Sequence, residues 1–379
     1  MIPYGRQSID EEDIAEVAKV LRGDFLTTGP KVAEFERALC DLTGAKHAVA
    51  CSNGTTALHL AGLALNLQAG DHVIVPTLTF LATANAVRYC GAEVIFADVD
   101  PHTGIMTAEH LAETLENNQD KTIKAVFPVH LTGQCVDMEK ITPLARAHNL
   151  KIIADCAHAI GSQTNGAQAG ACIFEDMATF SFHPVKTIAA GEGGAIMTNR
   201  QDQAERMRRL RSHGMAPAPA IGPWAYEIQE LGFNYRMTDF QCALGLSQLQ
   251  KIDRFIARRS ALATLYDTLL HHIAPVIAPP KRLTHCCPAW HLYAVRIDFD
   301  ALGMTRADLM NALRDRGIGT QVHYIPVHHQ PYYKNRYGTL ALQGADHYYE
   351  HTLSLPLFPA MTERDVAFVV DNIKNIIGA

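Results

Sequence analysis

Residues 151–158 of the chain read KIIADCAH, an apolar run that ends in a carboxylate. The run has the length and composition of a buried strand, and Asp155 stands at its carboxyl end. Ligands of open α/β sheets bind outside the carboxyl ends of the strands, so Asp155 lies where a ligand-binding or catalytic residue is expected. Taken alone, the residue is more simply explained as a turn or helix N-cap aspartate.

The chain around this run alternates apolar segments with segments of helical period. Strands are predicted at 47–50, 73–76, 93–99, 125–129, 151–155, 177–182 and 195–198, with a tight turn at 191–194. Helices are predicted at 56–67, 81–90, 108–116 and 138–148, preceded by one that begins at Ser8 and ends at Gly23 and another at 32–42. This alternation predicts an α/β fold with a large, mostly parallel sheet covered on both faces.

The pattern changes after residue 236. One long helical stretch at 240–270 leads into a strand at 292–297, a helix at 305–316, a strand at 319–324 and a helix at 362–377. We therefore predict a large α/β domain over residues 1–240, and a long connecting helix with a small α+β domain over residues 241–379.

Composition excludes several classes of protein. The 33 Lys and Arg residues against 39 Asp and Glu give a net charge of −6, and no basic run suggests a nucleic-acid partner. No stretch has the roughly 20 apolar residues that span a bilayer, and the first residues are polar, so we expect a cytoplasmic protein without membrane contact. The nine cysteines are scattered without CxxC spacing, which argues against a disulfide framework and a thiolate zinc site.

Two further segments could carry chemistry. Residues 180–187, FSFHPVKT, place Lys186 in an apolar, uncharged neighbourhood after a predicted core strand. Desolvation there would lower the amine pKa and make the lysine nucleophilic, although a snorkelling surface lysine is the common alternative. Residues 52–58, SNGTTAL, join a strand to a helix. They would form a phosphate cradle of helix amides and hydroxyls, or an ordinary helix cap.

The order of these three segments resembles the fold-type-I enzymes that depend on pyridoxal 5'-phosphate. More narrowly, the whole chain is similar to the DegT/DnrJ/EryC1/StrS sugar aminotransferases in GTTAL 54–58, PTLTF 76–80, PVHLTG 128–133, GEGG 191–194, LRSHG 210–214 and GFNYRM 232–237. His158, where glutamine is usual in that family, resembles the branch that acts in pseudaminic acid biosynthesis, as do SFH 181–183 and QVHY 321–324.

The resemblance implies roles for particular residues. Lys186 and Asp155 would be catalytic: Lys186 as the Schiff-base lysine that also moves protons, and Asp155 as the partner of the pyridine nitrogen. Phe80 would stack on the ring unless it is a plain core aromatic, and His158 would lie beside the ring. Gly54, Thr55 and Ser181 would bind the phosphate, together with Asn234 from the second subunit of a homodimer. His183 is interpreted as a core histidine bonded to the backbone.

The sequence signals for binding of the second substrate, the sugar nucleotide, are weaker. By resemblance, the sugar-nucleotide pocket would be lined by Tyr4, Asp24, Phe25, Leu26, Thr27, Gln321, Val322, His323 and Tyr324, which could equally be a tail, a loop and a strand. His323, His328 and His329 suggest a metal, but neither a HExxH motif nor a facial carboxylate accompanies them, so no metal site is predicted.

The expected activity is amino transfer from L-glutamate to C4 of UDP-2-acetamido-2,6-dideoxy-beta-L-arabino-hexos-4-ulose. Transamination of another nucleotide keto sugar, of the perosamine or bacillosamine type, is the alternative. A sugar dehydratase of this family has histidine where Lys186 stands, and a ligand-sensing member would need neither Lys186 nor Asp155. A histidine-based metallohydrolase is a further alternative. The sequence does not determine the stereochemistry of the sugar, the nucleotide or the amino donor.

Overall fold

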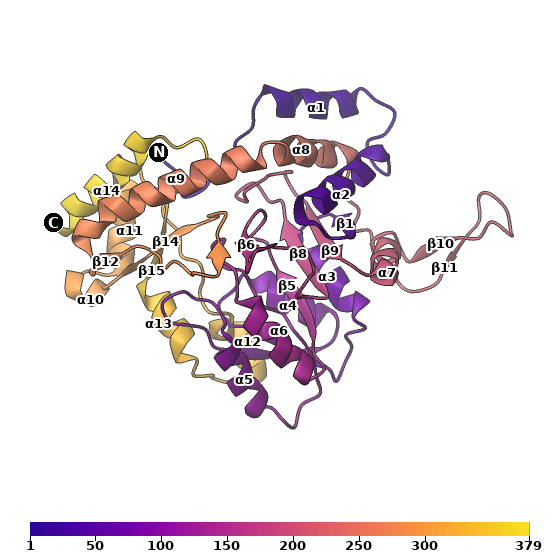
Figure 1. Cartoon of the computed structure of the whole chain (residues 1–379), viewed down its shortest axis with the longest axis horizontal. Coiled ribbons are helices and arrows are strands. Elements are labelled where there is room, and N and C mark those ends of the chain that lie inside the picture. The colour runs from indigo at the N-terminus through magenta and orange to yellow at the C-terminus, as the bar shows by residue number, and fades with distance from the viewer. Residues whose placement is uncertain (379) are drawn as a thin grey trace.

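A seven-stranded sheet lies at the centre of the computed structural model, which describes residues 1–378 (Figure 1). Its strand order is β1-β9-β8-β5-β4-β2-β3. In that order the strands span His47–Cys51, Gly194–Thr198, Met177–Ser181, Lys151–Asp155, Ile123–Val126, His72–Pro76 and Glu93–Ala97. Only β9 runs antiparallel to its neighbours, which confirms the predicted, mostly parallel sheet.

Helices cover both faces of this sheet. Successive side chains of β5 show why, since Ile153 packs into one apolar cluster while Ile152 and Ala154 pack into clusters on the opposite face. The helices of this part of the chain are α1 (Glu11–Leu21), α2 (Pro30–Thr43), α3 (Gly54–Ala64), α4 (Leu81–Tyr89), α5 (Ala108–Glu116), α6 (Met138–Ala147) and α7 (Gln201–Arg211). Three short strands accompany them: β6 (Gln163–Thr164) and β7 (Ala167–Gln168) in a small sheet with β13 (Cys286–Cys287).

The C-terminal part packs around a second, smaller sheet. That sheet consists of β12 (Ile277–Ala278), β14 (Tyr293–Ile297) and β15 (Thr352–Leu355). Its helices are α8 (Asp239–Leu249), α9 (Ile252–Leu270), η1 (His271–Ile273), α10 (Phe299–Leu302), α11 (Arg306–Asp315), η2 (Val327–His329), α12 (Pro331–Tyr337), α13 (Gln343–His351) and α14 (Glu363–Ile377).

The buried guanidinium of Arg259 joins α9 to the segment before β14 and to the segment after β15. Arg259 is 1% exposed, and its Nη1 donates to the carbonyls of Trp290, His291 and Leu357 at 3.2, 3.1 and 2.9 Å. Three carbonyl acceptors thereby bind one buried cation. The backbone before β14 and the backbone after β15 are held together at this point.

A hairpin projects away from the body of the molecule (Figure 1). It is formed by β10 (Met215–Pro217) and β11 (Tyr226–Ile228), which pair only with each other. Its apolar side chains are open to solvent, with Trp224 76% exposed and Ile221, Tyr226 and Ile228 also exposed. An apolar surface of this kind on a projecting element is typical of a contact with another protein.

The structure differs from the sequence prediction at two helices. The stretch 240–270 is not one helix, because Gln250 ends α8 and Lys251 begins α9. Lys251 is buried there and forms ion pairs with Asp10 and Asp13 of the N-terminal segment, so the chain turns to bring the amine to them. In α1, Asp10 is the N-cap rather than Ser8, and it shares a capping box with Asp13.

Two other local predictions are also wrong. Residues 319–324 form no strand, because β15 fills the position beside β14 and only Gln321 makes a bridge to Ser354. The predicted turn at 191–194 is part of a longer connection, residues 182–193, that joins β8 to β9 and contains Lys186.

All nine cysteines lie within the described residues and are free, and Cys51, Cys135, Cys156, Cys172, Cys242 and Cys286 are buried, as expected for small apolar side chains. No helix among residues 1–378 is long and apolar enough to cross a membrane.

Candidate active site

A cavity of about 710 Å³ lies at the carboxyl edge of the central sheet. The residues that follow β2, β4, β5 and β8 all contribute to its wall, as expected for a ligand site in an open α/β sheet. It brings together most of the predicted site residues: Tyr4, Gly54, Thr55, Phe80, Asp155, His158, Ser181, Lys186, Gln321, Val322, His323 and Tyr324.

One end of the cavity is built to receive an anion. Asn53 caps α3 by accepting from the amide of Thr56 at 2.9 Å, while Gly54 and Thr55 belong to the first turn, whose amides have no partner within a helix. A Cβ placed on Gly54 would lie 2.8 Å from Cβ of Ser181. The end of β8 therefore packs directly against the start of α3, and Ser181 adds a hydroxyl beside the helix amides. Such a cradle fits a phosphate group.

The carboxylate of Asp155 is fixed at the floor of the cavity. It is 5% exposed, and its two oxygens accept from Thr83 Oγ1 at 2.7 Å and from the amide of Ala157 at 3.0 Å. Thr83 in turn lies 2.8 Å from Thr79 Oγ1, so a short chain of hydroxyls ends on the carboxylate. Burial raises the pKa of Asp155, and the bonds from Thr83 and Ala157 oppose this rise. A buried carboxylate held in this way fits a cationic ring nitrogen.

Lys186 reaches the same cavity from the connection between β8 and β9. Burial lowers the pKa of its amine from 10.5 to about 8, while the charge of Asp155 partly opposes the shift. About one amine in eleven is therefore neutral at pH 7, far more than for an ordinary lysine, and the neutral amine is the form that attacks carbonyl carbon. The apolar neighbourhood noted in the sequence has the effect that was predicted, and Lys186 is not a snorkelling surface lysine.

His158 is held as a neutral ring. Its Nδ1 accepts from the amide of Thr132 at 3.3 Å, so the ring proton is on Nε2 and is donated to Tyr324 Oη at 3.1 Å. Burial, together with the nearby charge of Lys186, holds the pKa of His158 well below its usual value. Tyr324 accepts this bond and keeps its own proton, which it can donate to a ligand.

Phe80 is not a core aromatic. Its side chain is 56% exposed at the N-terminus of α4, and its ring lies 5.9 Å from that of Tyr324 on the cavity wall. An exposed aromatic face inside a cavity provides a stacking surface for a flat ligand.

Some predicted residues lie elsewhere. Residues 24–27 and Asn234 are exposed and do not line the cavity of their own chain. His183 lines the cavity but is exposed rather than part of the core; its Nδ1 accepts from the amide of Val185 at 3.4 Å. His323 contacts Ser354 Oγ at 2.8 Å and is thus separate from the pair His328 and His329, which meets Asp346 instead.

Sequence reasoning missed four residues of the site. Thr79 and Thr83 orient Asp155, while His291 and Gln330 line the cavity. Thr83 could have been found from its position one turn into a helix that follows Phe80. The ring of His291 lies 4.4 Å from that of His158. No sequence signal marks His291 as a site residue, because only the folding of the chain brings it next to His158.

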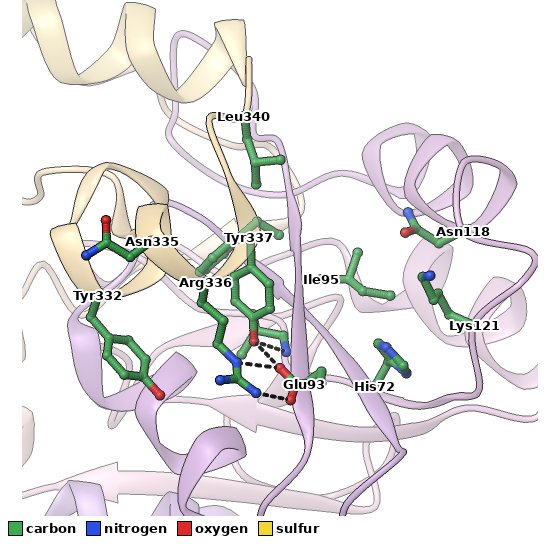
Figure 2. Close-up of a pocket in the computed structure, with 12 residues that line it drawn as sticks. His72, Glu93, Ile95, Asn118, Lys121, Tyr332, Asn335, Arg336, Tyr337 and Leu340 are labelled. Atoms are coloured by element: carbon green, nitrogen blue, oxygen red, sulfur yellow. Dashed lines mark hydrogen bonds and ion pairs between the residues drawn. The ribbon is translucent and has the colours of Figure 1, made fainter.

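A second cavity, of about 1010 Å³, lies beside the edge strand β3, where Glu93 and Ile95 meet Arg336 and Tyr337 (Figure 2). Its carboxylate, Glu93, is occupied by ion pairs with Arg336 and Arg88 and by the hydroxyl of Tyr337 at 2.8 Å. Arg336 first, with Tyr337 and Arg88, lowers the pKa of Glu93 to about 2. Tyr337 also accepts from the amide of Val94 at 2.9 Å. This cluster covers the edge strand β3 and lacks the nucleophile and anion cradle of the first cavity.

Comparison with known proteins decides the family. A family model described as the DegT/DnrJ/EryC1/StrS aminotransferase family matches residues 7–374. The chain belongs to the DegT/DnrJ/EryC1/StrS aminotransferase family. The family and the similar solved structures are sugar aminotransferases that depend on pyridoxal 5'-phosphate, and the protein is an enzyme of this type. The predicted fold class and cofactor are thereby confirmed.

Several known proteins resemble the chain over its full length. Helicobacter pylori PseC, an aminotransferase involved in the biosynthesis of pseudoaminic acid, matches with a TM-score of 0.92 and 29% identity over 100% of this chain and 99% of that one. The PLP-form of the putative sugar aminotransferase Spr1654 from Streptococcus pneumoniae matches with a TM-score of 0.90 and 27% identity, over 100% and 98%. The spore coat polysaccharide biosynthesis protein SpsC of Bacillus subtilis is 38% identical over 386 residues, covering 99% and 97%.

Proposed function

We propose that this sugar aminotransferase places nitrogen on C4 of UDP-2-acetamido-2,6-dideoxy-beta-L-arabino-hexos-4-ulose in pseudaminic acid biosynthesis, with L-glutamate as the donor. The observation that carries the proposal is the likeness to Helicobacter pylori PseC over the whole chain, including the segment 321–324 that lines the cavity here. Another nucleotide keto sugar, of the perosamine or bacillosamine type, is the second candidate. It is favoured by the higher sequence identity to SpsC, a protein of polysaccharide biosynthesis.

The residues of the cavity fit pyridoxal phosphate. When bound, that group supplies an electron sink which stabilises negative charge on a carbon that loses its proton. Lys186 would hold it covalently through Nζ, and the freed amine would then take and return the proton at the reacting carbon. The pKa of Lys186, lowered by burial to about 8, suits both duties.

Four other groups would hold the cofactor in position. The first-turn amides of α3 and the hydroxyl of Ser181 would bind the phosphate, and Phe80 would cover a ring face. Asp155 would pair with the ring nitrogen and keep it protonated. Because Thr83 and Ala157 already fix both carboxylate oxygens, the pairing requires little reorganisation.

The sugar would bind on the side of the cavity formed by Tyr4 and residues 321–324. Tyr324 receives a hydrogen bond from His158, so its hydroxyl proton is directed to a ligand oxygen. A keto or hydroxyl oxygen of the sugar is the expected acceptor. The neutral state of His158 keeps a second positive charge away from Lys186.

The active enzyme would be a homodimer with shared sites. Asn234 is exposed and bridges to Ser212, close to the start of β10, so it lies near the base of the hairpin. The hairpin projects from the body of the molecule (Figure 1), and its Trp224 and Ile221 are exposed. Burial of this hairpin against a second copy would cover its apolar side chains. Asn234 would then supply a donor to the phosphate in the partner's cavity.

The substrate proposal is tested by incubating the purified holoenzyme with L-glutamate and a panel of nucleotide 4-keto sugars, followed by mass spectrometry of the products. We expect the UDP-linked 4-keto-6-deoxy-N-acetylhexosamine of L-arabino configuration to be aminated fastest. The Lys186→Ala protein is the control for non-enzymatic amination. Preference for a GDP-linked keto sugar, or for the isomer of D-xylo configuration, would replace the first candidate by the second.

A further inference from the structure

Two histidines and a carboxylate converge outside the active-site cavity. His328 and His329 are consecutive residues of η2, and Asp346 lies in the first turn of α13. One ligand atom from each lies within 4.8 Å of those of the other two. The sequence predicted no metal because no carboxylate accompanies the histidines, yet the fold brings one from 17 residues further along the chain.

His328 is oriented in a way that ordinary packing does not explain. The residue is 3% exposed, and its Nδ1 lies 2.7 Å from Thr77 Oγ1, which fixes the plane of the ring. Its Nε2 is buried and has no hydrogen-bond partner among residues 1–378, since Asp346 Oδ1 is 3.7 Å away. A buried polar atom without a partner is costly, and here it points toward a carboxylate.

The other two groups are accessible. Asp346 Oδ1 lies 2.6 Å from His329 Nε2, and both side chains are about one third exposed. Asp98 accepts from the amides of Gly344 and Ala345 at the start of α13, which holds that helix in position and adds a second negative charge nearby. Because both side chains are partly open to solvent, water can serve as a further ligand.

We propose that His328 Nε2, His329 Nε2 and Asp346 Oδ1 bind one divalent cation of the zinc class. Two imidazole nitrogens and one carboxylate oxygen form a donor set that zinc accepts, and water completes the tetrahedron. The bond from His328 Nδ1 to Thr77 is the outer contact that metal-binding histidines usually have, and it leaves the lone pair on Nε2. Tetrahedral ligands lie roughly 3.3 Å apart, so small rotations of the two exposed side chains suffice.

The cation would have a structural role. Val327 donates its amide to the carbonyl of Thr77 at 2.7 Å, and residues 321–325 just before it line the cavity. A bond from η2 to α13 would therefore fix the far end of the segment that carries the sugar-binding residues. None of the three ligands lines the cavity itself, so the cation takes no part in amino transfer.

Equilibrium dialysis of the chelator-treated holoenzyme against zinc ions, with metal analysis, tests the proposal. We expect one tightly bound zinc per chain and a melting temperature that rises with zinc concentration. His329→Ala and Asp346→Asn, both at the surface, should each weaken zinc binding at least ~10-fold and abolish the thermal shift. Thr77→Val removes the outer contact and should weaken binding about 10- to 100-fold.

The control is the pair His347 and His351, whose rings stack at 4.2 Å on the exposed side of α13 and could bind zinc adventitiously. His347→Ala should leave the tight site and its thermal shift intact. Zinc binding that is lost in His347→Ala, or retained unchanged in both His329→Ala and Asp346→Asn, would overturn the assignment, as would the absence of tight binding to the wild-type chain. Circular dichroism verifies that each variant is folded.

Discussion

The reactivity of Lys186 gives a quantitative prediction for the capture of pyridoxal phosphate by the apo-enzyme. Its amine pKa of about 8, against an ordinary 10.5, makes the neutral fraction about 300-fold larger at pH values well below 8. At pH 7, about one amine in eleven is neutral. The rate of capture should therefore rise about tenfold per pH unit up to roughly pH 7 and become level above about pH 9.

Stopped-flow absorbance near ~400 to 430 nm, after mixing apo-enzyme with the cofactor at different pH values, measures this rate. The same reaction with N-α-acetyl-lysine corrects for the cofactor's own titration, because both reactions share it. A corrected profile that keeps rising to about pH 10 would show that burial does not lower the pKa of Lys186 and would refute the argument.

Asp155 provides a second test of the same electrostatic argument. Its negative charge raises the pKa of Lys186 and thus opposes the effect of burial. Asp155→Asn should therefore shift the midpoint of the capture profile below 8, toward a more acidic pH. A shift in the alkaline direction would mean that the carboxylate does not act on the amine through its charge.

Three further outcomes are expected. Lys186→Ala should leave no borohydride-fixed adduct, as measured by the mass of the protein, whereas an adduct on another lysine would contradict its role. Asp155→Asn should slow turnover by about 10²-fold while the cofactor still binds, and unchanged turnover would exclude its pairing with the ring nitrogen. Mixing Lys186→Ala with Asn234→Ala subunits should restore activity toward about a quarter of wild type, since one site of each heterodimer is intact; no recovery despite verified subunit exchange would contradict a shared site.

The parts of the site that could be predicted are those determined by local sequence. The strand that ends at Asp155 and the capped start of α3 need only neighbouring residues to define them. Lys186 was identified because the absence of nearby charge is visible in the sequence itself. These features depend on hydrophobic period and capping, which act over a few residues.

The parts that were missed depend on contacts between distant residues. Thr83 binds Asp155 from 72 residues away, and Lys251 meets Asp10 across 241. Neither pairing changes the local pattern of apolar residues. The helical period continues across residues 250 and 251, so it does not reveal the break between α8 and α9. The segment 319–324 has the composition of a strand, but it pairs with β15 only through the single bridge between Gln321 and Ser354.

The buried guanidinium of Arg259 has a consequence for how the enzyme encloses its substrates. Arg259 and the carbonyls that it binds, those of Trp290, His291 and Leu357, all lie in the C-terminal part of the chain, so a rotation of that part would not separate them. Pulling α9 away from these segments would leave a cation without partners in the interior. Any movement that closes the cavity should therefore carry α9 and His291, which lines the cavity, together as one unit.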